Sequence, residues 1–185
     1  MTCSRSPQTS TYLTTSTTKK SKMLVLGIDP GIAKTGWGVV DIVGQRYRPV
    51  SFGVVKTEAK TPVESRIHAI ANDVGSLATQ FKVDAVSMED IFFAKNVSSA
   101  ITVAKVIGAI IQQMSLQGIP VTLFTPLQIK MAVTGYGTAE KHQVQEMVRL
   151  LLKLETVPSP DHAADSLAAA ICYATNGALG KRIGL

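Results

Sequence analysis

MLVLGIDPGIAKTGWGVVDI, residues 23–42, carries the pattern from which the fold can first be predicted. It begins with a short apolar run that ends at Asp29, passes through a turn region at residues 31–36, and continues as a second apolar run in residues 35–42. Residues 46–56 form a third run of the same kind. Short runs rich in β-branched residues are typical of strands, and tight connections join antiparallel neighbours. We therefore predict that the fold opens with an antiparallel meander of three strands.

Downstream of the meander, helical and strand patterns alternate. Thr61 and Pro62 resemble a cap and a first helical residue, and they predict a helix that runs to about Phe81. The later predicted elements are a strand at 84–90, a helix at 98–117, a strand at 119–124, a short helix from 125–126 to about 135, a helix at 140–154 and a last helix from 159 that stops at 176–177. This order predicts an α/β fold with a five-stranded mixed β-sheet flanked by α-helices.

The composition is that of a single globular domain with a short segment at each end. The chain has 185 residues, of which 45% are hydrophobic and 17% are charged. Residues 1–22 are rich in Ser, Thr and Lys, and we expect a disordered N-terminal extension there. A translation start at Met23 is an alternative to a transit peptide. We expect residues 23–178 to be the folded domain and residues 179–185 to be a flexible C-terminal tail.

The charge distribution favours a polyanionic partner. The formal net charge is +6, and residues 1–22 contribute +4 of it because they carry four basic residues and no acid. The remaining chain has 15 basic and 13 acidic residues. Some of these acids fall in the motifs described below, namely Asp29, Glu89, Asp90, Asp161 and Asp165. If they converge on metal ions, the rest of the surface is more basic than the total suggests.

The cysteines and the lengths of the apolar runs indicate the compartment. Cys3 and Cys172 lie at opposite ends of the chain, which predicts no disulfide framework and a reducing cytoplasm. No uninterrupted apolar run approaches the roughly 18 residues that span a bilayer. We therefore expect a cytoplasmic protein with no membrane partner.

Three acids and a histidine stand at the ends of predicted elements. Asp29 ends the first strand, Glu89 lies at the end of the fourth, and His162 and Asp165 share one face of the last helix. Ligand sites form at the carboxyl ends of parallel strands, so we expect these groups to meet at one edge of the sheet. Carboxylates so close together stay ionised only beside a cation. Oxygen ligands favour Mg²⁺ or Mn²⁺, and two such ions can clamp a phosphodiester during hydrolysis.

Each of these residues also has a purely structural alternative. Asp29 could be a turn aspartate, Glu89 or Asp90 could simply cap the strand end, and His162 could bond to a backbone carbonyl. We interpret Asp161 as a first-turn acid that complements the helix dipole. Asp165 is harder to explain structurally, because an apolar run follows it in a helix that should be largely buried, and a buried aspartate needs partners.

The predicted helix at residues 98–117 has almost no polar face. A helix that is apolar all round is buried on more than one side. One side must pack on the sheet. The other side could pack on a second subunit, where Ala100, Ala104 and Gly108 would allow close approach, or under other helices of the same chain. We expect a homodimer.

Four segments together carry a resemblance to a known family: GIDPGIAKTGWGVVD, MEDIFFAKNVSSA, GYGTAEKHQVQEMV and PDHAADSLAAAICYA. In this order they resemble the RuvC-family junction resolvases of the RNase H-like superfamily, over residues 23–176. The resemblance implies a metal-dependent endonuclease that resolves four-way (Holliday) DNA junctions in recombination and repair. Paired nicks would leave ligatable 5′-phosphate and 3′-hydroxyl ends.

The same resemblance implies roles for individual residues. Asp29, Glu89, His162 and Asp165 would be the catalytic residues and would hold two Mg²⁺ or Mn²⁺ ions. The fourth ligand stays open, because the family has His or Asp at the position of His162 and Asp161 is adjacent.

The resemblance also implies contacts with DNA and with partner proteins. Phe92 would stack on an unpaired base at the junction centre, although its neighbour Phe93 is an alternative. Lys95, Lys130 and Lys141 would contact phosphates. A symmetric dimer would carry two active sites for two opposed strands, and RuvA and RuvB would be branch-migration partners.

Three other functions share parts of this pattern. Actin-like ATPases and sugar kinases also open with Asp-x-Gly before a glycine-rich hairpin, but they duplicate the fold, and the sequence has no second copy. An RNase H-like nuclease acting on RNA or on an RNA–DNA hybrid would share the acids but not the apolar helix or the Phe92 loop. A non-catalytic nucleic-acid-binding module would not need three acids at element ends.

Overall fold

The computed structural model describes residues 22–91 and 97–183. Residues 1–21, which make up most of the predicted N-terminal extension, lie outside the described residues. The described elements, in chain order, are β1 (Lys22–Asp29), β2 (Lys34–Val43), β3 (Arg46–Lys56), α1 (Val63–Phe81), β4 (Ala85–Glu89), α2 (Val97–Leu116), β5 (Val121–Phe124), α3 (Pro126–Thr134), α4 (Lys141–Leu152) and α5 (Asp161–Ile183).

The strands form one mixed sheet in the order β3-β2-β1-β4-β5. β1 and β2 pair antiparallel, as do β2 and β3, whereas β4 is parallel to both β1 and β5. The predicted five-stranded mixed sheet and its antiparallel meander are therefore confirmed. Ile28 of β1 pairs with Met88 of β4, so both strands reach their carboxyl ends at the same edge of the sheet.

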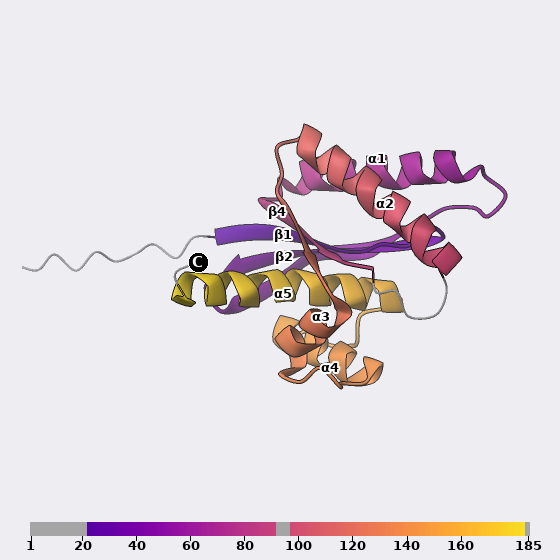
Figure 1. The fold of residues 1–185 in the computed structure, drawn as a ribbon. Helices are drawn as coiled ribbons and strands as arrows, with labels where there is room; N and C mark the ends of the chain where they lie inside the picture. Colours follow the sequence, from indigo (N-terminus) through magenta and orange to yellow (C-terminus); the bar gives the residue numbers. More distant parts are fainter. Residues whose placement is uncertain (1–21, 92–96, 184–185) are drawn as a thin grey trace, which may run out of the picture.

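Helices cover both faces of the sheet (Figure 1). α1 and α2 lie on one face, α5 lies on the other, and α3 and α4 pack beside α5. Successive strand residues point to opposite faces, and this alternation divides the core into two clusters. Val25 of β1 packs on the α5 side, and Leu26 and Ile28 pack on the α1 and α2 side.

Two helix ends differ from the sequence prediction. α5 continues to Ile183 and does not stop at Gly177, so it includes residues 179–183 of the predicted tail. A glycine within a helix costs only about 1 kcal/mol and does not by itself end the helix. The N-cap of α1 is Pro62 rather than Thr61, and it has no side-chain cap. The cap of α3 is as predicted: the Thr125 hydroxyl accepts a hydrogen bond from the backbone N–H of Gln128.

Within the described residues, the apolar helix α2 is buried on one side only. Its buried residues pack with α1 and the sheet in one core cluster, and they are Val106, Ile107, Ile110 and Met114. On its other side Ile101 is 50% exposed and Ile111 is 37% exposed, and a Cβ on Gly108 would meet no atom within 4 Å. α1 packs against α2, so the buried side lies partly under another helix of the same chain, whereas the side with Ile101 and Ile111 stays exposed within the described residues.

The segment Ser98–Leu116 of α2 is long and apolar enough, by length and composition alone, to cross a membrane. A core helix of a domain passes the same test, and α2 packs on the sheet as such a helix does.

Candidate active site

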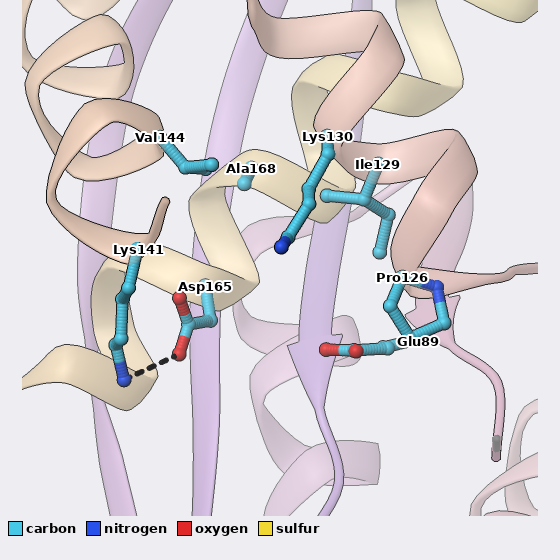
Figure 2. A pocket seen from close by; sticks show the side chains of 8 residues that line it. All are labelled: Glu89, Pro126, Ile129, Lys130, Lys141, Val144, Asp165 and Ala168. Carbon is cyan, nitrogen blue, oxygen red and sulfur yellow. Dashed lines mark ion pairs between the residues drawn. The ribbon is translucent and has the colours of Figure 1, made fainter. Parts of the chain in front are cut away.

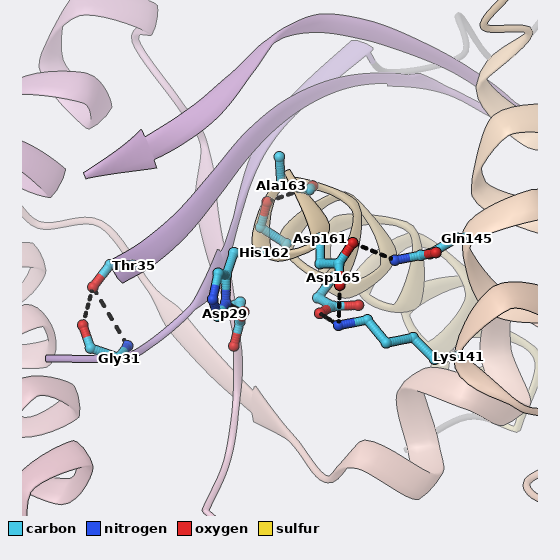
Figure 3. A network of polar contacts seen from close by, with 10 residues as sticks. Asp29, Gly31, Thr35, Lys141, Gln145, Asp161, His162, Ala163 and Asp165 are labelled. Atoms are coloured by element: carbon cyan, nitrogen blue, oxygen red, sulfur yellow. Dashed lines mark hydrogen bonds and ion pairs between the residues drawn. The ribbon is translucent and has the colours of Figure 1, made fainter. Parts of the chain in front are cut away.

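The carboxyl edge of the sheet carries the predicted acids. Asp29 is the last residue of β1 and Glu89 is the last residue of β4. α5 begins at Asp161 against the same edge, so that its first turns bring His162 and Asp165 to it (Figure 3). The strand ends and the helix start therefore converge as the sequence predicts.

Two glycines allow α5 to reach this edge. A Cβ on Gly27 of β1 would lie 1.9 Å from the carbonyl oxygen of Ser166, and a Cβ on Gly36 of β2 would lie 1.9 Å from that of His162. Real contacts are never so short, so a side chain at either position would push the helix off the sheet. The Ser87 hydroxyl of β4 donates a 2.6 Å hydrogen bond to the carbonyl of Ala169 and holds the helix in place.

This role of the two glycines was not predicted from the sequence, in which Gly36 falls in the predicted turn region. A glycine inside a strand often marks a close approach of another backbone, and this signal is present at both positions.

Asp29 and His162 form a direct hydrogen bond. His162 Nδ1 lies 2.7 Å from Asp29 Oδ2, and the two residues are 133 positions apart in the chain. The carboxylate can only accept, so Nδ1 is the donor. A neutral imidazole that donates from Nδ1 keeps its lone pair on Nε2. The imidazole is 40% exposed, which leaves the ring within reach of an incoming ligand.

Lys141, at the start of α4, pairs with two acids of α5. Its Nζ lies 3.1 Å from Asp161 Oδ2 and 3.3 Å from Asp165 Oδ2, and Gln145 donates a 3.2 Å hydrogen bond to Asp161. Burial acts to lower the pKa of Lys141, but the hydrogen bond to Asp161 and the charge of Asp165 raise it overall. The same hydrogen bond lowers the pKa of Asp161. Asp161 is therefore a partner of Lys141 as well as a first-turn acid.

Glu89 carries the largest electrostatic perturbation among the acids of this edge. Burial, followed by the negative charges of Asp29 and Asp165, raises the pKa of Glu89 to about 7, against the opposing effect of Lys130 and Lys141. Burial also raises the pKa of Asp165, which Lys141 partly offsets. Close carboxylates raise one another's pKa in this way when no cation compensates them.

A cavity of about 270 Å³ opens between these acids and the helices α3 and α4 (Figure 2). The two acids in its wall are Glu89 and Asp165, and the two cations are Lys130 and Lys141. Apolar side chains of Pro126, Ile129, Val144 and Ala168 complete the wall. Such a cavity suits an anionic ligand that approaches the carboxylates beside the lysines.

The donor set fits a hard divalent cation. Three carboxylates and one imidazole are the ligands that Mg²⁺ and Mn²⁺ accept. As the side chains lie, no three Asp, Glu, His or Cys residues within 22–91 and 97–183 form a closed ligand group. His162 holds Asp29, and Lys141 holds Asp165. Burial is the main cause of the raised pKa of Glu89, and the negative charges of Asp29 and Asp165 add to it.

The structure places most of the predicted site residues at this edge: Asp29, Glu89, Lys130, Lys141, His162 and Asp165. Phe92, Phe93 and Lys95 lie outside the described residues, so the predicted stacking and the third lysine contact stay predictions.

Comparison with known proteins gives a consistent match. Residues 25–173 match the model of the family "Crossover junction endodeoxyribonuclease RuvC". A relative of that name from Brevibacillus brevis is 51% identical over 152 residues, which are 82% of this chain and 92% of the relative. One from Desulforamulus reducens is 41% identical over 162 residues, or 87% of this chain and 99% of the relative.

Solved structures give the same match. The Thermus thermophilus RuvC structure superposes with a TM-score of 0.80 and 37% identity over 85% of this chain and 97% of that one. T. thermophilus RuvC in complex with Holliday junction substrate superposes with a TM-score of 0.81 and 36% identity over 85% and 96% of the two chains.

Proposed function

The chain belongs to the RuvC family of crossover junction endodeoxyribonucleases, with its RNase H-like fold, and we propose that it resolves Holliday junctions by hydrolysing DNA strands at the carboxyl edge of its sheet. The observation that carries this proposal is the convergence of Asp29, Glu89 and Asp165 at one edge beside two lysines. The family match spans the domain and decides against the actin-like ATPase, the hybrid-cutting nuclease and the non-catalytic module.

We propose that Asp29, Glu89, His162 and Asp165 together hold two divalent ions, Mg²⁺ or Mn²⁺. Bound ions of this kind supply an activated water and stabilise the charge on a leaving oxygen. The products would be 5′-phosphate and 3′-hydroxyl ends, which a ligase can join.

The chain's own side chains prepare the site for this chemistry. His162 fixes the orientation of the Asp29 carboxylate through its Nδ1–H. The carboxylate is then already oriented as a ligand when a metal ion binds. In the protein without bound DNA, Lys141 forms an ion pair with Asp165. A phosphate in the cavity would give Lys141 and Lys130 a new anionic partner, and the Asp165 carboxylate would then be released to act as a ligand.

The DNA contacts of this proposal extend beyond the described residues. Lys130 and Lys141 line the cavity, and we propose that they bind phosphate oxygens. Phe92 and Lys95 follow Glu89 in the chain, and we keep for them the roles of base stacking and phosphate binding.

We propose that the working unit is a homodimer built on the exposed side of α2. Ile101 and Ile111 leave apolar surface there, and Ala104 and Gly108 would allow a second helix to approach closely. A two-fold axis would give two active sites for two opposed strands of a junction. We further propose a cytoplasmic location and branch-migration proteins of the RuvA and RuvB type as partners.

The substitution Asp29→Asn tests whether Asp29 is a metal ligand or only a structural turn residue. Asparagine keeps the size of the side chain but lacks the negative charge, so junction binding in chelator should stay within about threefold while cleavage falls by at least about 100-fold. Asp73→Asn on the exposed face of α1 is the matched control and should cleave normally. Gel shift and single-turnover cleavage measure the two properties. Retained cleavage, or equal loss of binding, would contradict the role of Asp29.

A further inference from the structure

The loop that follows Asp29, residues 30–33, is held at three successive carbonyl groups. The buried Thr35 hydroxyl donates a 2.7 Å hydrogen bond to the carbonyl of Gly31. The Thr57 hydroxyl donates to the carbonyl of Ile32 at 2.5 Å, and the Thr57 backbone N–H donates to that of Ala33 at 3.2 Å. A loop with this many anchored carbonyls holds the residue that precedes it, Asp29, in a defined place.

Arg66 completes this arrangement from the first turns of α1. Its Nε donates a 2.8 Å hydrogen bond to the Thr57 hydroxyl, and its Nη2 lies 3.2 Å from the carbonyl oxygen of Ile32. A hydroxyl has one proton, which Thr57 gives to Ile32, so its lone pair is free to accept from Arg66. One planar guanidinium therefore reaches the same carbonyl twice, directly and through Thr57.

The hydrogen-bond partners of Arg66 show that its guanidinium binds to this loop and to Thr57. Within the described residues it has no ion pair with an acid, and its guanidinium donates its hydrogen bonds to Thr57 and Ile32. Ile32 packs against the core cluster on the α1 and α2 side of the sheet. Asp29 is thus fixed from two directions, by His162 on the α5 side and by this loop on the α1 side.

We propose that Arg66 and Thr57 are positioning residues for Asp29 in the cleavage reaction, an inference that rests on the proposed function of the site. They touch neither DNA nor the reacting atoms in this proposal. They act through the Ile32 carbonyl, which sets the path of the chain just after Asp29. Groups that hydrogen-bond directly to a metal ligand are worth roughly 10- to 100-fold in metal affinity or activity, and we expect an effect within this range from the backbone support that Arg66 and Thr57 give to Asp29.

Paired substitutions test the proposal. Thr57→Val keeps the shape but removes the hydroxyl, and Thr57→Ser restores it. Arg66→Gln removes the guanidinium, and Arg66→Lys keeps the charge but cannot serve both acceptors in one plane. Arg48→Gln, on an exposed residue of β3, is the matched control. The measurements are single-turnover junction cleavage, Mn²⁺ affinity by calorimetry, junction Kd in chelator, and Tm.

Thr57→Val and Arg66→Gln should cut about 10- to 100-fold more slowly and bind Mn²⁺ correspondingly more weakly, while junction Kd changes by less than about twofold. Thr57→Ser should recover most of the rate, and Arg66→Lys should fall between wild type and Arg66→Gln. A merely structural role would lower Tm and the active fraction but leave Mn²⁺ affinity unchanged.

Several outcomes would overturn the proposal. Normal Mn²⁺ affinity and rate in the folded Thr57→Val variant would do so, as would a Thr57→Ser variant as slow as Thr57→Val. If the severe variants do not fold, Thr57→Ser and Arg66→Lys still decide between the two roles. Failure of the wild-type chain to cut a junction would contradict the proposed function itself, which is a different result from equal cleavage by wild type and variants.

Discussion

Glu89→Gln should make the metal-free protein more stable at neutral and alkaline pH while it abolishes cleavage. Burial and the neighbouring charges of Asp29 and Asp165 raise the pKa of Glu89 to about 7 in the folded chain, from an ordinary value of 4.5. Ionised Glu89 is therefore unfavourable in the folded state. Glutamine has nearly the same shape as a protonated glutamate and carries no charge at any pH, so the variant avoids that penalty.

The sign and size of the effect follow from proton linkage. Below about pH 4.5 the carboxyl group is protonated in both states, and it has no effect on folding. Above about pH 7 it is ionised in both states, and the folded state bears the full penalty. A pKa of about 7 against 4.5 corresponds to about 3 kcal/mol. Stability of the wild type relative to the variant should thus fall between about pH 4.5 and pH 7.

Denaturant unfolding in chelator at pH 5 and pH 8 measures this difference. We expect Glu89→Gln to raise the free energy of unfolding by about 3 kcal/mol at pH 8 and by less than about 1 kcal/mol at pH 5. Glu58→Gln, at an exposed position, is the matched control and should change stability by less than about 0.5 kcal/mol. An equal effect of Glu89→Gln at both pH values, or none at pH 8, would refute this electrostatic account.

Two further substitutions test the packing that positions the site and the proposed dimer. Gly36→Ala places a Cβ 1.9 Å from the His162 carbonyl oxygen, so unfolding in denaturant should show a loss of about 1–3 kcal/mol, and junction cleavage should fall with it. Unchanged stability would mean that α5 moves freely off β2. Ile111→Glu on the exposed side of α2 should convert a dimer to a monomer in sedimentation experiments, and an unchanged mass would locate the dimer interface elsewhere.

Local patterns in the sequence were sufficient to predict the sheet and the placement of the acids. Asp29 and Glu89 each follow a short apolar run, and parallel strands end at a common edge of the sheet. The proximity of the two acids could therefore be predicted once β1 and β4 were taken as neighbouring strands. His162 and Asp165 followed from helical spacing and from the start of the last helix. These features depend on nearby residues, which is why they can be read from the sequence.

The remaining features depend on contacts between distant parts of the chain. The pairing of Lys141 with Asp165 requires α4 and α5 to pack with a particular offset, and no local pattern fixes that offset. Arg66 and Ile32 are 34 positions apart, so the anchored loop after Asp29 was not predicted. The end of α5 was predicted too early, because a glycine ends a helix only where the surrounding packing favours a left-handed residue.

Cleavage of a synthetic four-way junction beside a matched linear duplex, with Mg²⁺, with Mn²⁺ and with chelator, is the decisive experiment for a metal-dependent junction resolvase. We expect paired nicks in the junction alone, sealable by ligase, with either ion, and no cleavage in chelator. Cleavage that persists in chelator would contradict the metal site at Asp29, Glu89, His162 and Asp165. Equal cleavage of junction and duplex, or no cleavage with either ion, would contradict junction resolution as the function of this chain.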